Sequence, residues 1–381
     1  MRRIMVAVGT RPEAIKMAPV VTTLAEGDSN FDVRLCLTGQ HRQMLDQALS
    51  VFDLKGHTDL NLMRPNQDLS SLTAAVLESM KSVLAEEKPD LVLVQGDTTT
   101  TFAVALAAFY ARIPVGHVEA GLRTWDMAAP YPEEANRCLT TVLTALHFPP
   151  TVGAKENLLR AQVPADRIFV TGNTVIDALL KTARRLESDE ALATRIRSAF
   201  PFIRPDARLV LITGHRRESF GEGFDHICEG VQRAATRFPD TDFVYPVHLN
   251  PNVREPVFRQ LGARPNVHLI EPVDYLAIVW LMQRAHLVLT DSGGIQEEAP
   301  SLGKPVLVMR EKTERPEGVE ANTSRLVGTS ADRIFEGIVG LMEDRSMYEA
   351  MSHASNPYGD GTASLQILNA LQGWFAGLSN G

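Results

Sequence analysis

Residues 287–298 read Leu-Val-Leu-Thr-Asp-Ser-Gly-Gly-Ile-Gln-Glu-Glu, and residues 305–309 read Pro-Val-Leu-Val-Met. The apolar run 287–290 is typical of a buried strand. The glycine pair after Ser292 allows a sharp turn into a helix that we expect to begin near Ile295. The second apolar run then returns as a parallel strand. This order of elements predicts an α/β sheet with helices on both faces.

The same turn has the composition of an anion site. Backbone N–H groups of residues 292–294 lie at the start of a helix, where the helix dipole favours a phosphate group. Glu297 and Glu298 follow one turn later, within reach of sugar hydroxyls, and residues 313–316 form a Thr-Glu-Arg-Pro loop. An ordinary α/β turn explains the glycines equally well. The acidic pair and the loop favour a nucleotide-sugar site.

Length and composition indicate a globular protein with two α/β domains. A chain of 381 residues is too long for one compact core, and 44% hydrophobic with 22% charged residues is ordinary. No apolar run approaches the roughly 20 residues of a membrane span, and the basic first residues precede too short an apolar run for a signal peptide. We therefore expect a cytoplasmic location and no membrane partner.

Charge and cysteine usage exclude further classes. The net charge of −8 argues against nucleic acid as a partner. Cys36, Cys138 and Cys228 are widely spaced and odd in number, which favours free thiols over a disulfide framework or a zinc site.

Changes in composition along the chain suggest the domain boundaries. We expect a first domain over residues 1–186 and a second over 208–355. The charged, proline-containing stretch 187–207 reads as the linker between them. A tail over 356–381 carries a final helix.

Two cations follow the first predicted strand, residues 4–8. Arg11 and Lys16 lie near the start of the next helix, so a phosphate could meet two positive charges and a helix dipole together. An ordinary turn with solvated side chains is the alternative.

Two carboxylates follow neighbouring strands of the first domain. Asp97 comes after the strand 91–95, and Glu119 comes after the strand 115–118. Ligands of open α/β sheets bind outside the carboxyl ends of strands, so both residues are placed for chemistry. Asp97 could instead cap the helix that follows it. A carboxylate at the equivalent end of a second strand makes capping a less sufficient explanation for both.

A further pair and a histidine complete the candidates. Glu133 and Arg137 are four residues apart and share a helix face, where a surface ion pair is the plain alternative. His215 follows the strand 209–213 beside two arginines. A core or capping histidine is possible there, but the neighbouring arginines favour an anion ligand.

Seven motifs together resemble one family, the non-hydrolysing UDP-N-acetylglucosamine 2-epimerases of bacteria. They are Gly9-Thr10-Arg11-Pro12-Glu13, Gly96-Asp97-Thr98-Thr99-Thr100, His117-Val118-Glu119-Ala120-Gly121-Leu122-Arg123-Thr124, Pro132-Glu133-Glu134, Gly214-His215-Arg216-Arg217-Glu218, Thr290-Asp291-Ser292-Gly293-Gly294-Ile295-Gln296-Glu297-Glu298 and Asn356-Pro357-Tyr358-Gly359-Asp360-Gly361. The resemblance implies two Rossmann-like domains whose parallel sheets face a cleft, the glycosyltransferase B-type fold. It also implies a homodimer and a last helix that packs back on the first domain.

The resemblance implies interconversion of UDP-N-acetylglucosamine and UDP-N-acetylmannosamine, which feeds bacterial surface polysaccharides. It implies that Asp97, Glu119 and Glu133 act as acid and base, with His215 beside them. The implied nucleotide-sugar ligands are Arg11, Lys16, Arg137, Tyr275, Ser292, Gly293, Gly294, Glu298 and Arg315. Ile278 stands where family members carry an aromatic residue near the uracil, with Tyr275 close by.

The family also binds a second UDP-N-acetylglucosamine at a regulatory site. Gln40, Gln43, Arg216 and His248 match that site. No metal or nicotinamide is implied, and none of the six tyrosines has a lysine four residues later, as hydride-transfer epimerases require.

Three other functions remain open from the sequence. A UDP-sugar glycosyltransferase shares the fold, and a non-catalytic sensor would keep the phosphate ligands without needing the three carboxylates. A hydrolysing variant would release free N-acetylmannosamine.

Overall fold

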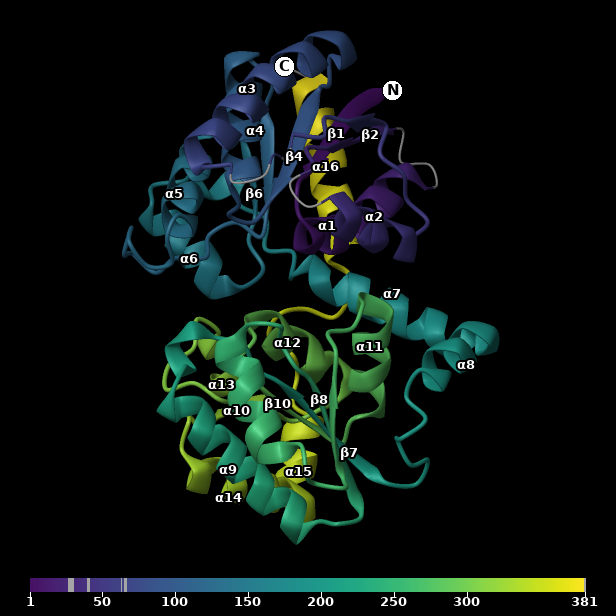
Figure 1. Cartoon of the computed structure of the whole chain (residues 1–381). Helices are drawn as coiled ribbons and strands as arrows, with labels where there is room; N and C mark the ends of the chain where they lie inside the picture. The colour runs from purple at the N-terminus through teal and green to yellow at the C-terminus, as the bar shows by residue number, and fades with distance from the viewer. Residues whose placement is uncertain (27–30, 40–41, 63, 65–66, 380–381) are drawn as a thin grey trace. The chain divides into compact units, whose positions relative to one another are not determined.

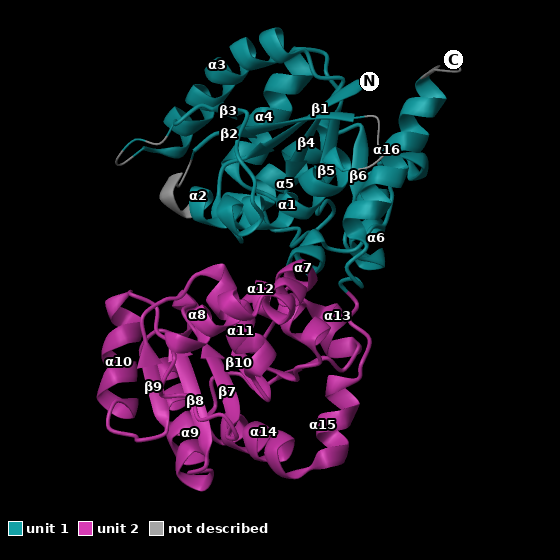
Figure 2. Ribbon diagram, turned by 90° about the vertical axis from the view of Figure 1, so that its right-hand side faces the viewer, with its two compact units in different colours: residues 1–178, 358–381 teal, residues 179–357 magenta. Residues whose placement is uncertain are grey.

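The structure, a computed structural model, describes residues 1–26, 31–39, 42–62, 64 and 67–379. The chain divides into two compact units (Figure 2). We call residues 1–178 with 358–381 unit 1, and residues 179–357 unit 2.

Unit 1 is built on one six-stranded sheet in the order β3-β2-β1-β4-β5-β6, with parallel pairing throughout. The strands are β1 (Arg2–Val8), β2 (Phe31–Leu37), β3 (Thr58–Asp59), β4 (Leu91–Gln95), β5 (Val115–Val118) and β6 (Leu146–Phe148). The strand order reverses between β1 and β4, the place where ligands bind in doubly wound sheets.

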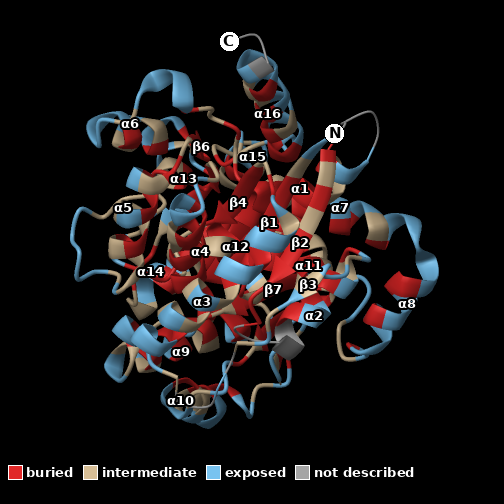
Figure 3. Ribbon diagram, turned by 90° about the horizontal axis from the view of Figure 1, so that it is seen from above, coloured by how far each residue is buried: buried red, intermediate tan, exposed pale blue. Residues whose placement is uncertain are grey.

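Helices alternate with these strands along the chain, and further helices follow β6. They are α1 (Arg11–Ala25), α2 (Arg42–Val51), α3 (Leu69–Glu87), α4 (Thr99–Tyr110), α5 (Glu133–Leu143), α6 (Val152–Arg160), the short η1 (Ala165–Arg167), α7 (Thr174–Ser188) and α16 (Ala363–Ser379). Leu91, Val92 and Leu93 of β4 are completely buried because helices cover the sheet, and Figure 3 shows β4 in the red of buried residues.

The last helix belongs to unit 1, far from its neighbours in sequence. Figure 1 shows α16 in yellow beside α1, with which it packs. The rings of Phe31 and Phe375 lie 5.7 Å apart. The carboxylate of Asp177, on α7, accepts hydrogen bonds from the backbone N–H of Ala363 at 3.2 Å and of Ser364 at 2.8 Å. These contacts satisfy donors at the first turn of α16.

Unit 2 repeats the architecture, with a six-stranded parallel sheet in the order β12-β11-β10-β7-β8-β9. The strands are β7 (Arg208–Thr213), β8 (Thr241–Pro246), β9 (Val267–Ile270), β10 (Leu287–Thr290), β11 (Val306–Val308) and β12 (Ser324–Leu326). The helices are α8 (Glu190–Ser198), η2 (Arg217–Ser219), α9 (Glu222–Arg237), α10 (Pro251–Leu261), α11 (Tyr275–Arg284), α12 (Gly293–Glu298), η3 (Ala299–Leu302), α13 (Pro316–Glu320), α14 (Ala331–Glu343) and α15 (Arg345–Ser352).

The predicted α/β class with two parallel sheets is confirmed. The boundary between the units lies inside α7, between Ala178 and Leu179, upstream of the stretch 187–207 that we expected as a linker. That stretch contains α8, whose apolar side chains Leu192 and Ile196 are buried. Among the described residues, no helix is both long and apolar enough to cross a membrane.

Candidate active site

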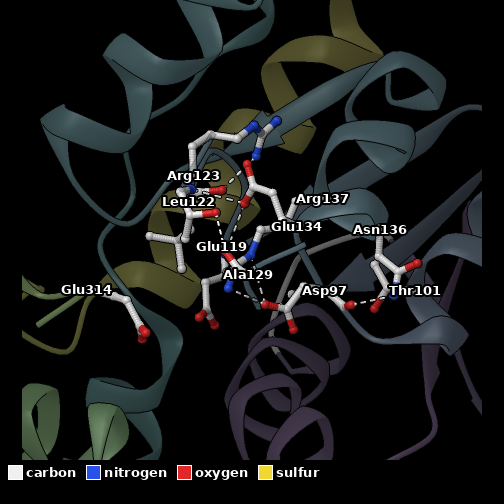
Figure 4. Close-up of polar contacts among 12 residues, drawn as sticks. Asp97, Thr101, Glu119, Leu122, Arg123, Ala129, Glu134, Asn136, Arg137 and Glu314 are labelled. Atoms are coloured by element: carbon white, nitrogen blue, oxygen red, sulfur yellow. Dashed lines mark hydrogen bonds and ion pairs between the residues drawn. The ribbon is translucent and has the colours of Figure 1, made fainter. Parts of the chain in front are cut away.

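The candidate carboxylates of unit 1 lie where β4 and β5 end. Asp97 follows β4 and Glu119 follows β5, and these two strands are adjacent and parallel. Because parallel strands bring their carboxyl ends to one edge of the sheet, both residues lie at that edge. Arg137 reaches the same region from α5, whose first residue is Glu133 and which packs on α4. Figure 4 shows Asp97, Glu119 and Arg137 gathered together.

Asp97 is paired with a cation and does not cap a helix. Its Oδ2 accepts from Arg137 Nε at 2.9 Å and from the terminal Arg137 nitrogen at 2.6 Å. Asn136 donates to the Asp97 carbonyl at 2.9 Å. The cap of α4 is Thr98, whose Oγ1 accepts from the N–H of Thr101 at 3.1 Å. The capping alternative for Asp97 is therefore wrong.

Glu119 is almost buried and sits in an unusual backbone conformation. It is 8% exposed, and its φ of 62° lies in the left-handed region that residues with a Cβ seldom adopt. Its carboxylate accepts from Lys16 Nζ and from Gln95 Nε2, both at 2.5 Å. Strain of this kind, of order 1 kcal/mol, persists where surrounding contacts hold it and clusters at functional sites.

Arg137 makes different contacts from those suggested by its spacing. Its guanidinium bridges Asp97 and Glu134, the second at 3.2 Å, and no ion pair with Glu133 occurs among the described residues. Burial works to lower the Arg137 pKa, but the charges of Asp97 and Glu134 outweigh it and raise the pKa. Glu133 Oε2 is buried and finds no hydrogen-bond partner in the described chain.

Glu13 is a buried carboxylate that our sequence analysis did not single out. Its Oε2 accepts from the N–H of Gly9 at 3.1 Å and of Thr10 at 2.7 Å. Its Oε1 accepts from the hydroxyls of Thr98 at 2.8 Å and Thr101 at 3.2 Å. Burial raises the pKa of Glu13, while these hydrogen bonds oppose the rise. Glu13 thus links the loop after β1 to the loop after β4.

A capping box could have pointed to Glu13, because Thr10 and Glu13 occupy the required positions at the start of α1. Arg11 lies in the first turn of the same helix and is partly buried. Lys16, predicted to bind phosphate, binds Glu119 in this structure.

In unit 2, His215 lies at the end of β7 against Asp291. The ring nitrogen Nδ1 is 3.3 Å from Asp291 Oδ1. The rings of His215 and His248 stack with centroids 5.6 Å apart. Burial lowers the pKa of His215, Asp291 opposes that effect, and His248 and Arg216 add to it. The predicted residues His215, Arg216 and His248 therefore lie together at the carboxyl ends of β7 and β8.

In the Ser292-Gly293-Gly294 turn, Ser292 is the N-cap of α12, which begins at Gly293, two residues before the predicted start near Ile295. A Cβ on Gly293 would lie 3.7 Å from the Arg315 guanidinium, so the bare backbone faces that cation. Arg315 in turn is paired with Glu297.

The other predicted ligands surround this turn. Tyr275 donates to Glu298 Oε1 at 3.1 Å, and Ile278 lies partly exposed one turn further along α11. Of the predicted regulatory residues, Gln40 lies outside the described residues. Gln43 lies in α2, but its side chain is also outside what the structure describes.

The described part of the chain contains no group of three or more His, Cys, Asp or Glu side chains that could hold a metal ion. Cys36, Cys138 and Cys228 are free thiols, as expected.

Comparison with known proteins gives a consistent assignment. The family model for UDP-N-acetylglucosamine 2-epimerase matches residues 24–372. The UDP-N-acetylglucosamine 2-epimerase of Escherichia coli is 58% identical over 370 residues, which cover 97% of this chain and 98% of that protein. A probable UDP-N-acetylglucosamine 2-epimerase of Ralstonia nicotianae is 58% identical over 376 residues, 99% of this chain and all of the relative.

A solved structure supports the same family assignment. The crystal structure of the Neisseria meningitidis UDP-GlcNAc 2-epimerase bound to UDP-GlcNAc aligns with a TM-score of 0.90 at 51% identity, covering 98% of this chain and 100% of that one. The predicted enzyme class and family are thereby confirmed. This chain belongs to the UDP-N-acetylglucosamine 2-epimerase family.

Proposed function

We propose that the protein interconverts UDP-N-acetylglucosamine and UDP-N-acetylmannosamine without hydrolysing either. The observation that carries this proposal is the cluster of Asp97 and Glu119 at the ends of adjacent strands of the unit 1 sheet, each bonded to a cation, with Glu133 one helical turn before the Arg137 that holds Asp97. A sensor or a simple UDP-binding module has no need of that cluster. The UDP-GlcNAc bound to the Neisseria relative supports the substrate.

The chemistry requires both acid–base groups and an anion site. The proton at C2 of the sugar lies beside an acetamido group and is not acidic in the ground state. Breaking the C1–O bond first places positive charge at C1, and this makes the C2 proton removable. Anti elimination gives UDP and 2-acetamidoglucal, and UDP then adds back after protonation of the other face. The route needs a base, an acid and stabilisation of the departing diphosphate.

The three carboxylates supply the acid–base groups in this proposal. Arg137 orients Asp97 through two hydrogen bonds, and Lys16 with Gln95 orients Glu119. Such fixed geometry favours proton transfer, because donor and acceptor must meet within hydrogen-bond distance.

Two sets of anion ligands are assigned in this proposal, one within each unit. In unit 1 they are Arg11 and Lys16, and in unit 2 they are His215, Arg315 and the backbone N–H groups of residues 292–294. Tyr275, which donates to Glu298 Oε1, and Ile278, one turn further along α11, are assigned to the nucleoside.

Product analysis in heavy water tests the function directly. Wild-type enzyme given UDP-N-acetylglucosamine alone should form UDP-N-acetylmannosamine and place deuterium at C2 of both epimers. Turnover that needs a sugar acceptor would indicate a glycosyltransferase, and release of free N-acetylmannosamine would indicate a hydrolysing enzyme. Epimerisation without deuterium at C2 would exclude proton exchange with water and thus the assigned carboxylates.

We also propose that Gln40, Gln43, Arg216 and His248 serve a regulatory UDP-N-acetylglucosamine site. The stacking of His248 on His215 supports a link between that site and the diphosphate site. The reverse reaction should then depend on traces of UDP-N-acetylglucosamine, and His248→Ala should weaken this dependence. Hyperbolic reverse kinetics with pure UDP-N-acetylmannosamine would remove the second site.

A homodimer formed through α4 and α5 is the final part of the proposal. Tyr110 is 71% exposed and Val142 is 78% exposed, and Phe109 and Leu139 are exposed on the same two helices. Exposed apolar side chains gathered on packed helices favour association. Val142→Glu should shift the sedimenting species from dimer to monomer. Assignment of the product to surface-polysaccharide synthesis in the cytoplasm rests on the family resemblance.

A further inference from the structure

Asp291 holds the turn that carries His215. It follows β10 and is only 1% exposed. Its Oδ2 accepts hydrogen bonds from the backbone N–H of His215 at 2.7 Å and of Arg216 at 2.8 Å. Two charge-assisted bonds to consecutive backbone groups fix the conformation of this turn.

The second oxygen of the carboxylate faces the imidazole itself. Asp291 Oδ1 is buried, has no hydrogen bond within the described chain, and lies 3.3 Å from His215 Nδ1. A buried carboxylate oxygen without a donor is costly. A proton on Nδ1 of His215 would satisfy it with little movement of the ring.

Two further hydrogen bonds hold the same turn. The buried hydroxyl of Tyr245 donates to the Gly214 carbonyl at 3.0 Å. The hydroxyls of Thr213 and Thr290 lie 2.6 Å apart, which ties the ends of β7 and β10 together. The His215 side chain is nevertheless 44% exposed, so its outer edge can meet a ligand.

We propose that Asp291 is a positioning residue for His215: it fixes the turn 214–216, keeps a proton on Nδ1 and leaves Nε2 directed at the departing diphosphate. The inference rests on the proposed function, since it assumes that His215 contacts the diphosphate. A carboxylate behind a histidine selects the ring tautomer and favours its cationic form. Positive charge near the leaving group is what elimination of UDP requires.

Several groups act on the His215 charge. Burial disfavours the imidazolium, as do the neighbouring His248 and Arg216, whereas Asp291 favours it. Of the side chains Asp291, His248 and Arg216, it is thus Asp291 that favours the cationic form of His215. Loss of its charge should make His215 lose its proton at lower pH, and an activity that needs the imidazolium should then decline at lower pH.

Asp291→Asn tests the proposal by removing only the charge. The amide oxygen can still accept from His215 and Arg216, while the amide nitrogen faces Nδ1 and disfavours a proton there. We expect the basic limb of the kcat profile to move down by about one pH unit or more. We also expect kcat at pH 8 to fall about tenfold, with a smaller change in KM.

Asp242→Asn is the matched control. Asp242 is also 1% exposed, accepts from the backbone N–H of Arg204 at 2.9 Å, and lies 3.3 Å from His268 Nε2. It is the second residue of β8, at the end of the strand opposite His248. This substitution should lower thermal stability and leave the basic limb where it is. An equal shift in both variants would show a general effect of lost buried charge and overturn the proposal.

Nitrogen NMR of the histidine rings, without substrate, separates the inference from the function. The His215 signal is identified by its loss in His215→Gln. Neutral wild-type His215 should carry its proton on Nδ1, and the Asp291→Asn titration midpoint should move down. A wild-type ring protonated only on Nε2 overturns the inference even if Asp291→Asn fails to fold. Absence of epimerisation by wild type, with the NMR result as expected, would instead overturn the proposed function.

Discussion

Asp97 and Glu119 give the most direct test at the scale of single residues. If they transfer protons, Asp97→Asn or Glu119→Gln should lower turnover at least about a hundredfold, the usual scale of acid–base catalysis. Neither change should weaken UDP binding comparably, as isothermal titration can show. Asp68→Ala is the control, because Asp68 caps α3 by accepting from Ser71 N–H at 2.7 Å. It should cost about 1 kcal/mol of stability and leave turnover intact.

Substitution of Glu13 should mainly lower stability, whereas substitution of Asp97 or Glu119 should mainly lower turnover. Glu13→Ala leaves the N–H groups of Gly9 and Thr10 without their buried acceptor, so we expect a loss of at least about 2 kcal/mol in unfolding free energy. Glu13→Gln should cost much less, because its amide oxygen can face those N–H groups and its nitrogen can face the threonine hydroxyls. Urea unfolding of the two variants measures the difference. Equal losses would mean that the carboxylate charge, rather than the hydrogen-bond geometry, holds the loops.

At the scale of elements, the paired strands β5 and β6 carry two buried histidines side by side. His117 and His147 are partners in the strand register, and both are 1% exposed. Burial lowers the pKa of His117 to about 4 and that of His147 to about 3. The unfolded chain binds protons at these sites below about pH 6.5, whereas the folded chain does not until far lower pH. Stability is therefore lost as the pH falls from about 6.5 toward 4.

Each histidine should contribute about 1.4 kcal/mol of lost stability per pH unit in that window. His147→Gln should reduce the dependence of unfolding free energy on pH by about one proton, measured by urea unfolding between pH 5 and 7.5. His353→Gln, at an exposed position on the last turn of unit 2, controls for loss of a histidine. An unchanged slope in His147→Gln would contradict a neutral buried His147.

Elements with continuous apolar runs could be predicted, and long-range contacts could not. Leu91–Gln95 and Leu287–Thr290 are strands, as their branched apolar residues indicate. β9 and β12 are short and include His268 and Arg325, so their sequences give little strand signal. They form because a neighbouring strand already offers an edge to pair with.

The candidate site shows the same limit. Spacing along α5 left an ion pair of Glu133 with Arg137 as the plain alternative, but the partner of Arg137 is Asp97, which comes from a strand end 40 residues away. Motifs identified Asp97, Glu119 and His215 because they lie directly after strands. The roles of Glu13 and Asp291 depend on atoms from other loops, which a local pattern does not contain. The positive φ of Glu119 likewise follows from its tertiary contacts.

At the scale of the whole molecule, α16 should be necessary for unit 1. Leu371 and Ile367 of this helix are completely buried, and Tyr358 and Phe375 nearly so. Burial of four large side chains is worth on the order of 6–10 kcal/mol, comparable with the stability of a domain. Removal of residues 358–381 should therefore make unit 1 sensitive to proteases while unit 2 stays resistant. Removal of residues 378–381 should leave both units resistant, because the side chain of Leu378 is exposed.

The division of unit 1 into residues 1–178 and 358–381 also sets an order of events during synthesis. The ribosome must make all of residues 179–357 before α16 emerges, which takes about 10 to 35 s at usual elongation rates. Unit 2 can be complete by then, whereas the nascent unit 1 still exposes the face of α1 that α16 will cover. The domain that leaves the ribosome first is thus the last to close, and this interval is when the growing chain most needs a chaperone.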